Sequence, residues 1–294
     1  MQKFSLLLIA LFVQVSVWAQ AGDKALVQVN YQFTHIHDTL HPDLPIKEEM
    51  VLYIGRNSSI YGSYELDRIA QDLKRQVQAI GFDGNLVLKS NRNVSQEAFL
   101  TNYGKRELQL IYSGMGGYYV LDEVYPEIDW EILDETALID GFGTQKARGS
   151  FGGRIYEAWF TTELPIQGAP WKLHGLPGLM LKARSLDGDV SFDFVELNTN
   201  LPSEIQISLP INGVKTTRKE LDRTIEAVKK NPSAAASAAF SGRTTFGGGL
   251  SFYSRSVDPL SALDASRIKS ISVQREGPEV SKEINNPLEK LTNK

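Results

Sequence analysis

The sequence contains no cysteine. Disulfide bonds, Cys-ligated zinc, iron–sulfur clusters and thiol catalysis are therefore excluded. We also expect no lipid anchor, because a bacterial lipoprotein carries its lipid on a cysteine. Histidine is scarce as well, with four in 294 residues, which leaves few side chains for proton transfer or transition-metal binding.

A strong excess of charge of either sign is also missing. The chain has 31 Lys and Arg against 35 Asp and Glu, a formal net charge of −4, and both signs are interspersed. This balance argues against a nucleic acid or an anionic membrane as partner. No cofactor-binding pattern is found, so we expect no cofactor.

The sequence has no hydrophobic run long enough to span a bilayer as a helix. The longest apolar segment lies at the amino terminus and is too short to do so. It follows Lys3 and precedes the small-residue site Val17-Trp18-Ala19. This layout predicts a signal peptide over residues 1–19, cleaved after Ala19, and hence a secreted or periplasmic protein. An uncleaved amino-terminal helix is the alternative. We expect the mature chain not to span a membrane.

Alternation with a period of two dominates the rest of the chain. Val27, Val29, Tyr31 and Phe33 alternate with polar residues, which is typical of a half-buried strand. Similar short segments lie at 50–54, 86–88, 108–112, 118–121, 128–132, 154–161, 179–183, 190–195, 205–209 and 268–273. Their spacing predicts a mainly β fold: a curved antiparallel sheet or half-barrel with one or two packed helices.

Two segments have helical periodicity instead. From Ser63, a plausible N-cap, apolar residues including Leu66 and Ile80 recur on one face as far as Gly81. Thr217 and Glu220 form a capping-box pattern before a second apolar stripe that ends at 231–232. Each stripe predicts a helix that lies against the sheet.

The pattern indicates one β-rich domain over residues 20–276. Within it, residues 233–249 are rich in Ala, Ser and Gly and predict a flexible insertion. Residues 277–294 are polar and charged, and we expect this tail to be loosely ordered.

The most informative motif is the GLPGLM hexapeptide, residues 175–180. Pro177 and Gly178 suit the second and third positions of a type II turn, in which Gly178 supplies a positive φ, and Gly175 belongs to the same turn. We expect a tight, partly buried turn between Trp171 and a core strand. His174 beside it is either a proton-transfer group or, as we favour, a side chain bonded to a turn carbonyl and packed on Trp171.

The hexapeptide resembles the signature of the GLPGLI family, secreted envelope proteins of Bacteroidota. The segments 31–39, 50–61, 129–165 and 285–289 are also similar to that family. Thr144 stands where such sequences often carry a cysteine, and Gly152 and Ala169 replace an expected Arg and Gly. The resemblance implies an envelope role and supplies no mechanism.

His35 and His37 form the low-ranked metal candidate, because two residues apart on a strand they share a face. His41, Asp38 and Asp43 lie nearby. A polar strand end explains the cluster better, and we predict no metal. The acidic residues between 122 and 135 are interpreted as a solvated strand face rather than as a glycosidase pair.

These observations predict a non-enzymatic binding or assembly factor of the envelope, with a hydrophobic ligand, a peptide or an outer-membrane protein as partner. The aromatic residues between 118 and 171 favour a contact surface at the concave side of the sheet or at the 171–181 hairpin. Two alternatives stay open: a hydrolase or metal enzyme using His35 and His37 or surface carboxylates, and a purely structural subunit of an outer-membrane complex. The candidate contact residues are Trp159, Trp171, His174, Leu176, Pro177 and Gly178, and no catalytic residue is predicted.

Overall fold

The computed structural model describes residues 22–114, 117–203, 205–210, 212–230, 254–255, 267–281 and 283–290. The predicted signal peptide and the predicted flexible insertion at 233–249 lie outside these residues.

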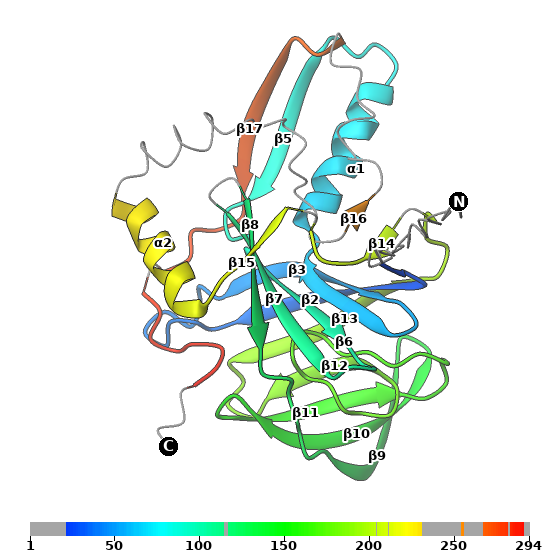
Figure 1. Cartoon of the computed structure of the whole chain (residues 1–294). Coiled ribbons are helices and arrows are strands. Elements are labelled where there is room, and N and C mark those ends of the chain that lie inside the picture. Colours follow the sequence, from blue (N-terminus) through cyan, green and yellow to red (C-terminus); the bar gives the residue numbers. More distant parts are fainter. Residues whose placement is uncertain are drawn as a thin grey trace, which may run out of the picture.

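One 12-stranded, curved sheet forms the body of the molecule (Figure 1). In order across the sheet, its strands are β15 (Gly213–Lys215), β8 (Gly117–Glu123), β7 (Glu107–Gly114), β6 (Glu97–Asn102), β4 (Ser58–Ser63), β3 (Ile46–Ile54), β2 (Val27–His35), β13 (Val190–Asn198), β12 (Leu179–Ser185), β11 (Arg154–Thr161), β10 (Phe142–Phe151) and β9 (Glu131–Ile139). All neighbours are antiparallel except β15 and β8, which are parallel. The sheet does not close into a barrel. The predicted mainly β fold with a large curved sheet is confirmed.

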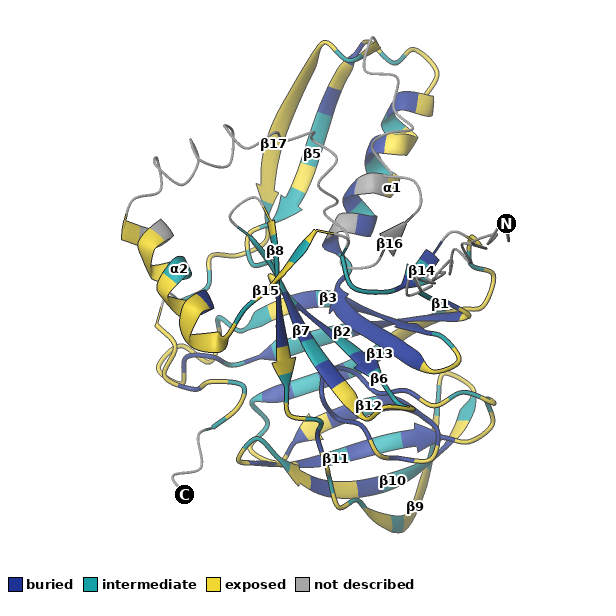
Figure 2. Ribbon diagram, viewed as in Figure 1, coloured by how far each residue is buried: buried dark blue, intermediate teal, exposed yellow. Residues whose placement is uncertain are grey.

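The main hydrophobic core fills the inside of the curve. It joins Val29 of β2, Leu110 of β7 and Tyr156 of β11, strands that lie far apart in the order of the sheet. Such residues share one core because the sheet curls around it. Leu173, from the loop between β11 and β12, is fully buried in the same core. Figure 2 shows this interior as a band of buried residues. The concave side is therefore filled by core side chains.

The opposite face of the sheet carries a second core cluster that includes Val51, Tyr53 and Ile111. Ile205 and Ile207 cover it from a small sheet of three short strands. These strands are β1 (Asp23–Lys24), β14 (Ile205–Ile207) and β16 (Ser254–Arg255). Burial on both faces explains why the central strands have little exposed surface.

An arm built from α1 (Glu65–Gln78), β5 (Asn85–Asn91) and β17 (Ser270–Glu276) projects from the body (Figure 1). β5 and β17 pair in parallel. Ile69, Leu73 and Val77 fall on one face of α1 and pack with Leu86 of β5. The apolar stripe correctly predicts the buried face of α1. The helix packs on this separate two-stranded sheet, however, and not on the large sheet as expected.

The boundaries of α1 differ from the prediction. Tyr64 is its N-cap and makes no side-chain capping bond, whereas Ser63 Oγ accepts a hydrogen bond from the Glu65 N–H (3.2 Å). Ile80 is fully exposed, because the helix ends at Gln78 before the apolar period reaches it.

The second predicted helix is α2 (Arg218–Lys230). Its capping box is present: the Thr217 N–H donates to Glu220 Oε2 (3.1 Å), and the Glu220 N–H donates to Thr217 Oγ1 (3.3 Å). Leu221 is fully buried against the main core. In the part of the chain that the structure describes, no helix is both long and apolar enough to cross a membrane.

The strand expected at 128–132 is wrong in position. β9 begins at Glu131, and Ile132 on it is half exposed, whereas Ile128 and Trp130 precede the strand and pack on the core. The Trp130 indole N–H donates to the main-chain oxygen of His174 (2.9 Å). This hydrogen bond holds the segment before β9 against the loop that carries His174. Local alternation cannot predict a contact between such distant residues.

The carboxyl-terminal segment is also different from the expectation of loose order. Asn286 is 4% exposed, and its side-chain amide donates to the main-chain oxygen of Ile36 (2.6 Å). Arg154, whose side chain is fully buried, donates to Asn286 Oδ1 (2.7 Å) and to the main-chain oxygens of Pro287 (2.9 Å) and Leu288 (3.2 Å). These hydrogen bonds attach residues 283–290 to the large sheet through Arg154 of β11 and to Ile36, which follows β2.

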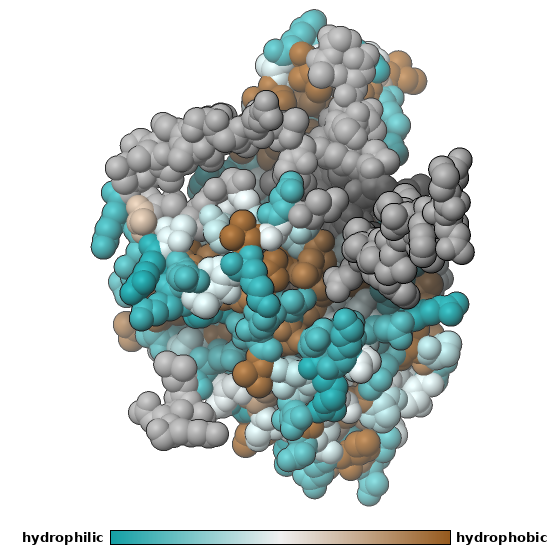
Figure 3. Space-filling view, viewed as in Figure 1, coloured by the Kyte–Doolittle hydropathy of each residue, from teal (hydrophilic) through white to brown (hydrophobic). Residues whose placement is uncertain are grey.

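Charged side chains reinforce this attachment. Lys172, which is 6% exposed, forms ion pairs with Glu289 (2.7 Å) and Glu123 (3.2 Å). On the face seen in Figure 3, hydrophobic residues lie in scattered patches among hydrophilic ones, as expected from interspersed charges.

Candidate functional site: a pocket beside the GLPGLM hexapeptide

The hexapeptide 175–180 runs from the loop that follows β11 into β12. Gly168, in the same loop, makes two main-chain hydrogen bonds to the hexapeptide. The Gly168 N–H donates to the Gly178 oxygen (3.2 Å), and the Gly168 oxygen accepts from the Met180 N–H (2.9 Å). Tyr31 Oη donates to the Met180 oxygen (2.7 Å). The loop is thus pinned to β12 and, through Tyr31, to the central strand β2.

The predicted type II turn at Pro177-Gly178 is wrong. The Gly178 N–H bonds to the Leu176 oxygen (2.9 Å), two residues back, which makes a γ-turn centred on Pro177. Gly178 does not have a positive φ; Gly175 does, at 120°. Glycine is needed at 178 for another reason: a Cβ there would lie 2.1 Å from the Thr161 oxygen. The requirement is a close approach to β11.

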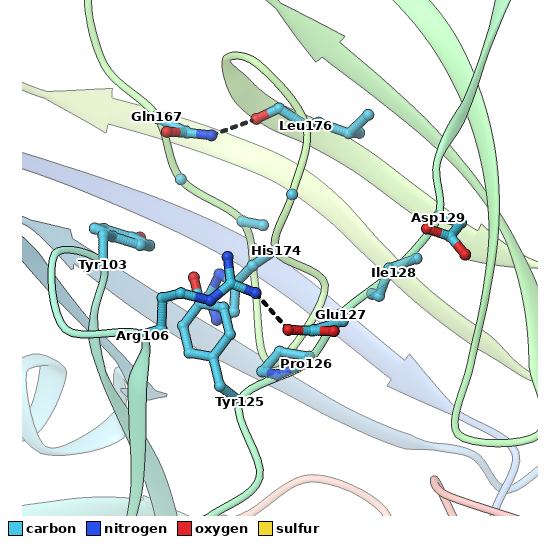
Figure 4. A pocket seen from close by; sticks show the side chains of 13 residues that line it. Tyr103, Arg106, Tyr125, Pro126, Glu127, Ile128, Asp129, Gln167, His174 and Leu176 are labelled. Atoms are coloured by element: carbon cyan, nitrogen blue, oxygen red, sulfur yellow. Dashed lines mark hydrogen bonds and ion pairs between the residues drawn. The ribbon is translucent and has the colours of Figure 1, made fainter.

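A pocket of about 460 Å³ opens beside this turn (Figure 4). Its volume is in the range of small-molecule sites. Its wall comes from three parts of the chain: the turn between β6 and β7, the segment that precedes β9, and the loop that carries the hexapeptide. The lining residues are Tyr103, Arg106, Tyr125, Pro126, Glu127, Ile128, Asp129, Gln167, Gly168, Ala169, His174, Gly175 and Leu176.

His174 lies in the wall of this pocket, 5% exposed. Its Nε2 is 3.1 Å from Thr101 Oγ1. Its ring stacks on Tyr125 (centroids 6.2 Å apart) and meets Tyr103 edge-on (5.9 Å). The expectation that His174 bonds a turn carbonyl and packs on Trp171 is therefore wrong: it bonds a hydroxyl and packs between two tyrosines.

Burial lowers the pKa of His174 to about 4. The imidazole is consequently neutral at neutral pH, because an unpaired buried cation is strongly disfavoured. Nδ1 makes no hydrogen bond to any residue that the structure describes. A buried, neutral ring with one uncommitted nitrogen thus faces the pocket.

Arg106 and Glu127 lie at the pocket's mouth, where they form an ion pair (2.5 Å). The Arg106 guanidinium also lies over the Tyr125 ring, 5.1 Å from its centroid. Arg106 has a positive φ of 53°, an uncommon conformation for a non-glycine residue. In Figure 4 the guanidinium lies in front of the Tyr125 and His174 rings.

The structure brings together part of the predicted contact set. His174, Leu176 and Gly175 line the pocket, whereas Trp159, Trp171, Pro177 and Gly178 do not. Trp171 is 3% exposed and packs on Phe151 and Phe192, so it belongs to the core. Trp159 lies on β11, with Lys146 Nζ 5.8 Å from its ring centroid.

Sequence reasoning missed the rest of the pocket, in particular Tyr103, Arg106, Tyr125 and Gln167. No local pattern marks them, since they come from separate turns. The Gln167 side-chain amide donates to the Leu176 oxygen (2.8 Å) and so supports the hexapeptide directly.

The His35 and His37 pair lies elsewhere, at the end of β2. The strand ends at His35, and the two ring centroids are 6.3 Å apart. Burial, with a smaller contribution from Arg154, lowers the pKa of His35 to about 4. His37 Nε2 is 2.9 Å from the Ser281 oxygen. Among the described residues, no group of three or more His, Asp or Glu side chains is placed to hold a metal ion.

Comparison with known proteins leaves the family open. No family model and no curated protein sequence matches the chain. Among solved structures, PNGF-II in a C2 crystal form and PNGF-II in a P21 crystal form are each 13% identical, with a TM-score of 0.48. Each match covers 69% of this chain and 33% of the other, so the similarity involves about a third of those chains.

The two depressed histidine pKa values predict that stability falls on acidification. His174 and His35 have folded pKa values of about 4 against 6.5 in the unfolded chain. Between those values the unfolded chain binds the extra protons, so stability decreases as pH falls from 6.5 to 4. Glu48 acts in the opposite direction between 4.5 and 7, because burial raises its pKa to about 7. Each histidine changes the free energy of unfolding by roughly 3 kcal/mol between pH 6.5 and pH 4.

Urea unfolding at pH 7 and pH 4.5 measures this effect. His174→Asn is expected to lose a large part of the pH dependence that the unchanged chain shows. Equal pH dependence in the His174 variant and the unchanged chain would contradict the buried neutral imidazole.

Proposed function

We propose that the protein is a non-enzymatic binding protein of the bacterial envelope, secreted or periplasmic, whose ligand occupies the pocket beside the hexapeptide. The observation that carries the proposal is the place of the chain's most distinctive motif: Gly175 and Leu176 form part of the pocket wall, next to His174. The resemblance to the GLPGLI family supports the envelope location.

The chemistry of the wall supports binding rather than turnover. Its described residues include no Ser, Thr, Cys or Lys side chain that could serve as a nucleophile. His174 is bonded to the Thr101 hydroxyl, and its pKa near 4 is far from the range that suits proton transfer at neutral pH. The tyrosine rings and the Arg106–Glu127 ion pair are instead features of a recognition site.

Mass spectrometry of the protein exported by its bacterial host and purified without denaturation tests this proposal. A small molecule or peptide should leave the protein on denaturation. Asp129→Trp should reduce its amount at least about tenfold, since a large ring at the pocket's rim blocks entry. Asp129 is exposed and makes no bond to other described residues, so the substitution leaves the fold intact.

The control is Asp134→Trp, the same change at an exposed position of β9 that does not line the pocket. It should retain the ligand in full. Equal ligand content in both variants, or none in the unchanged protein, would contradict binding in this pocket.

A further inference from the structure

The outer strand of the arm, β17, is exposed along its length. Every residue from Ser270 to Arg275 is exposed, including Ile271 (59%) and Val273 (63%), and Figure 2 shows the strand in the colour of exposed residues. β17 pairs in parallel with β5, and the two form a sheet of their own. Parallel sheets are normally covered on both faces, and two strands alone have little stability. The arm therefore presents a sheet that lacks a neighbour beyond β17 among the described residues.

The two edges of this small sheet differ. On the free edge of β5, the Gln76 side chain of α1 donates to the Val87 oxygen (2.8 Å) and accepts from the Val87 N–H (2.9 Å). Glu65 Oε1, also on α1, accepts from the Asn91 N–H (2.6 Å). The helix thus satisfies main-chain groups of β5, which lies between α1 and β17 (Figure 1). No described residue makes a hydrogen bond to the outer edge of β17, whose donors and acceptors can pair with another strand.

The apolar face of the arm continues past α1 onto β17. The register places Ile271 beside Leu86 and Val273 beside Leu88. Residues paired in this way point to the same face of a sheet. Leu86 and Leu88 pack with α1, whereas Ile271 and Val273 are not part of that cluster. A free edge with two exposed apolar side chains is a surface suited to the addition of a further strand.

The sequence of β17 is complementary to itself. In an antiparallel pair centred on Val273, Val273 lies opposite its own copy, Ile271 opposite Arg275, and Ser270 opposite Glu276. No like charges are opposed, and the aliphatic part of Arg275 can cover Ile271. Residues directly opposite each other share a face, so the apolar side chains of both copies lie together between the two α1 helices.

The outer strand β9 of the large sheet lacks such a register. Glu131, Asp134 and Glu135 are all exposed on it. An antiparallel pair of two β9 strands centred on Glu135 would bring carboxylates together, and like charges directly opposite each other are destabilising. Charged side chains are a usual protection of edge strands against pairing. Self-association is therefore favoured at β17 and disfavoured at β9.

We propose that two copies of the chain associate through β17, which pairs antiparallel with β17 of the second copy about a twofold axis at Val273. The two arms then form one four-stranded sheet in the order β5-β17-β17-β5, in which each copy closes the edge of the other. Ile271 and Val273 are buried in this sheet between the helices. None of the residues that line the pocket beside the hexapeptide belongs to the arm, so this interface is independent of the proposed function.

Sedimentation equilibrium of the protein at neutral pH measures the association. A seven-residue strand pair is a small interface, so we expect a dissociation constant on the order of 10 µM. Val273→Lys should weaken the dimer at least about tenfold, because it places two ammonium groups opposite each other on the axis. Leu138→Lys, at an exposed apolar position of β9, is the control and should leave the dissociation constant unchanged.

Cross-linking tests the position of the axis. The chain has no cysteine, so a single introduced cysteine can form a disulfide only with a second copy. In Val273→Cys the two thiols face each other within the distance that a disulfide spans, and mild oxidation should link the dimer. In Ile271→Cys each thiol lies two residues from the axis, so the two are about 13 Å apart and should not link. Electrophoresis without reductant separates the linked from the unlinked chains.

Three results would each overturn the inference: a protein that stays monomeric at about 1 mM, an unchanged dissociation constant in Val273→Lys, or equal cross-linking of the two cysteine variants. Loss of the dimer in Leu138→Lys would do the same, because it would place the contact at β9. Cross-linking of Val273→Cys alone would support the proposed pairing even if Val273→Lys failed to fold.

Discussion

Replacing Gly178 with alanine is expected to destabilise the protein by about 3 kcal/mol or more, at the upper end of the cost of forcing extra atoms into a packed site. The added Cβ would lie 2.1 Å from the Thr161 oxygen and 2.9 Å from the Thr161 carbonyl carbon, both main-chain atoms. Neither can rotate away, so β11 or the hexapeptide has to shift. The pocket wall at Leu176 would move with it. The midpoint of urea unfolding measures the loss.

Gly104→Ala is the matched control for this substitution. A Cβ at 104 would meet nothing closer than Asn102 Oδ1, at 3.7 Å. Its effect should stay within about 0.5 kcal/mol, as for other surface changes. If Gly178→Ala unfolds at the same urea concentration as the unchanged chain, the close approach to Thr161 is not the reason for glycine at this position.

Arg154→Met is expected to cost about 3–5 kcal/mol, the usual loss when one member of a buried ion pair is removed. The Arg154 side chain is fully buried and pairs with Asp187 (2.5 Å) and Asp189 (3.3 Å). Its other donors hold Asn286 and the main chain at Pro287 and Leu288. Methionine would remove the guanidinium from both carboxylates, although Lys290 still pairs with Asp187 and Asn286 still donates to Asp189. The Pro287 and Leu288 oxygens would lose the hydrogen bonds that Arg154 donates to them.

A second readout separates this mechanism from a general loss of stability. Residues 283–290 should become sensitive to carboxypeptidase in Arg154→Met under conditions where the sheet remains folded. Arg148→Met is the control: Arg148 is 45% exposed and pairs with Glu157 on the surface. Surface pairs contribute about 0–1 kcal/mol. A protected carboxyl terminus in Arg154→Met would contradict the role assigned to the arginine.

The features that the sequence could predict are the ones that local periodicity determines. Alternation at Val27, Val29 and Tyr31 correctly predicts the central strand, and these three residues face the main core. The expectation of a half-buried strand is wrong, because the alternating Gln28 and Asn30 are buried as well. The capping box at Thr217 and Glu220 correctly marked the start of α2. In both cases neighbouring residues carry the signal, so no knowledge of distant contacts is needed.

The features that it missed depend on contacts between distant segments. The need for glycine at 178 comes from Thr161 on another strand, although local turn chemistry offered a different reason. The order at Asn286 comes from the buried Arg154, which a polar tail composition cannot reveal. Arg106 and Tyr125 meet from two separate loops, so the pocket had no motif of its own.

The central claim is that a ligand occupies the pocket beside the hexapeptide. The most direct test is a crystal structure of the protein purified without denaturation from the organism that makes it. We expect electron density for a small molecule in this pocket beside Tyr125 and His174, with a donor atom of the ligand within hydrogen-bonding distance of His174 Nδ1. An empty pocket in a protein that carries its ligand at another surface would contradict it.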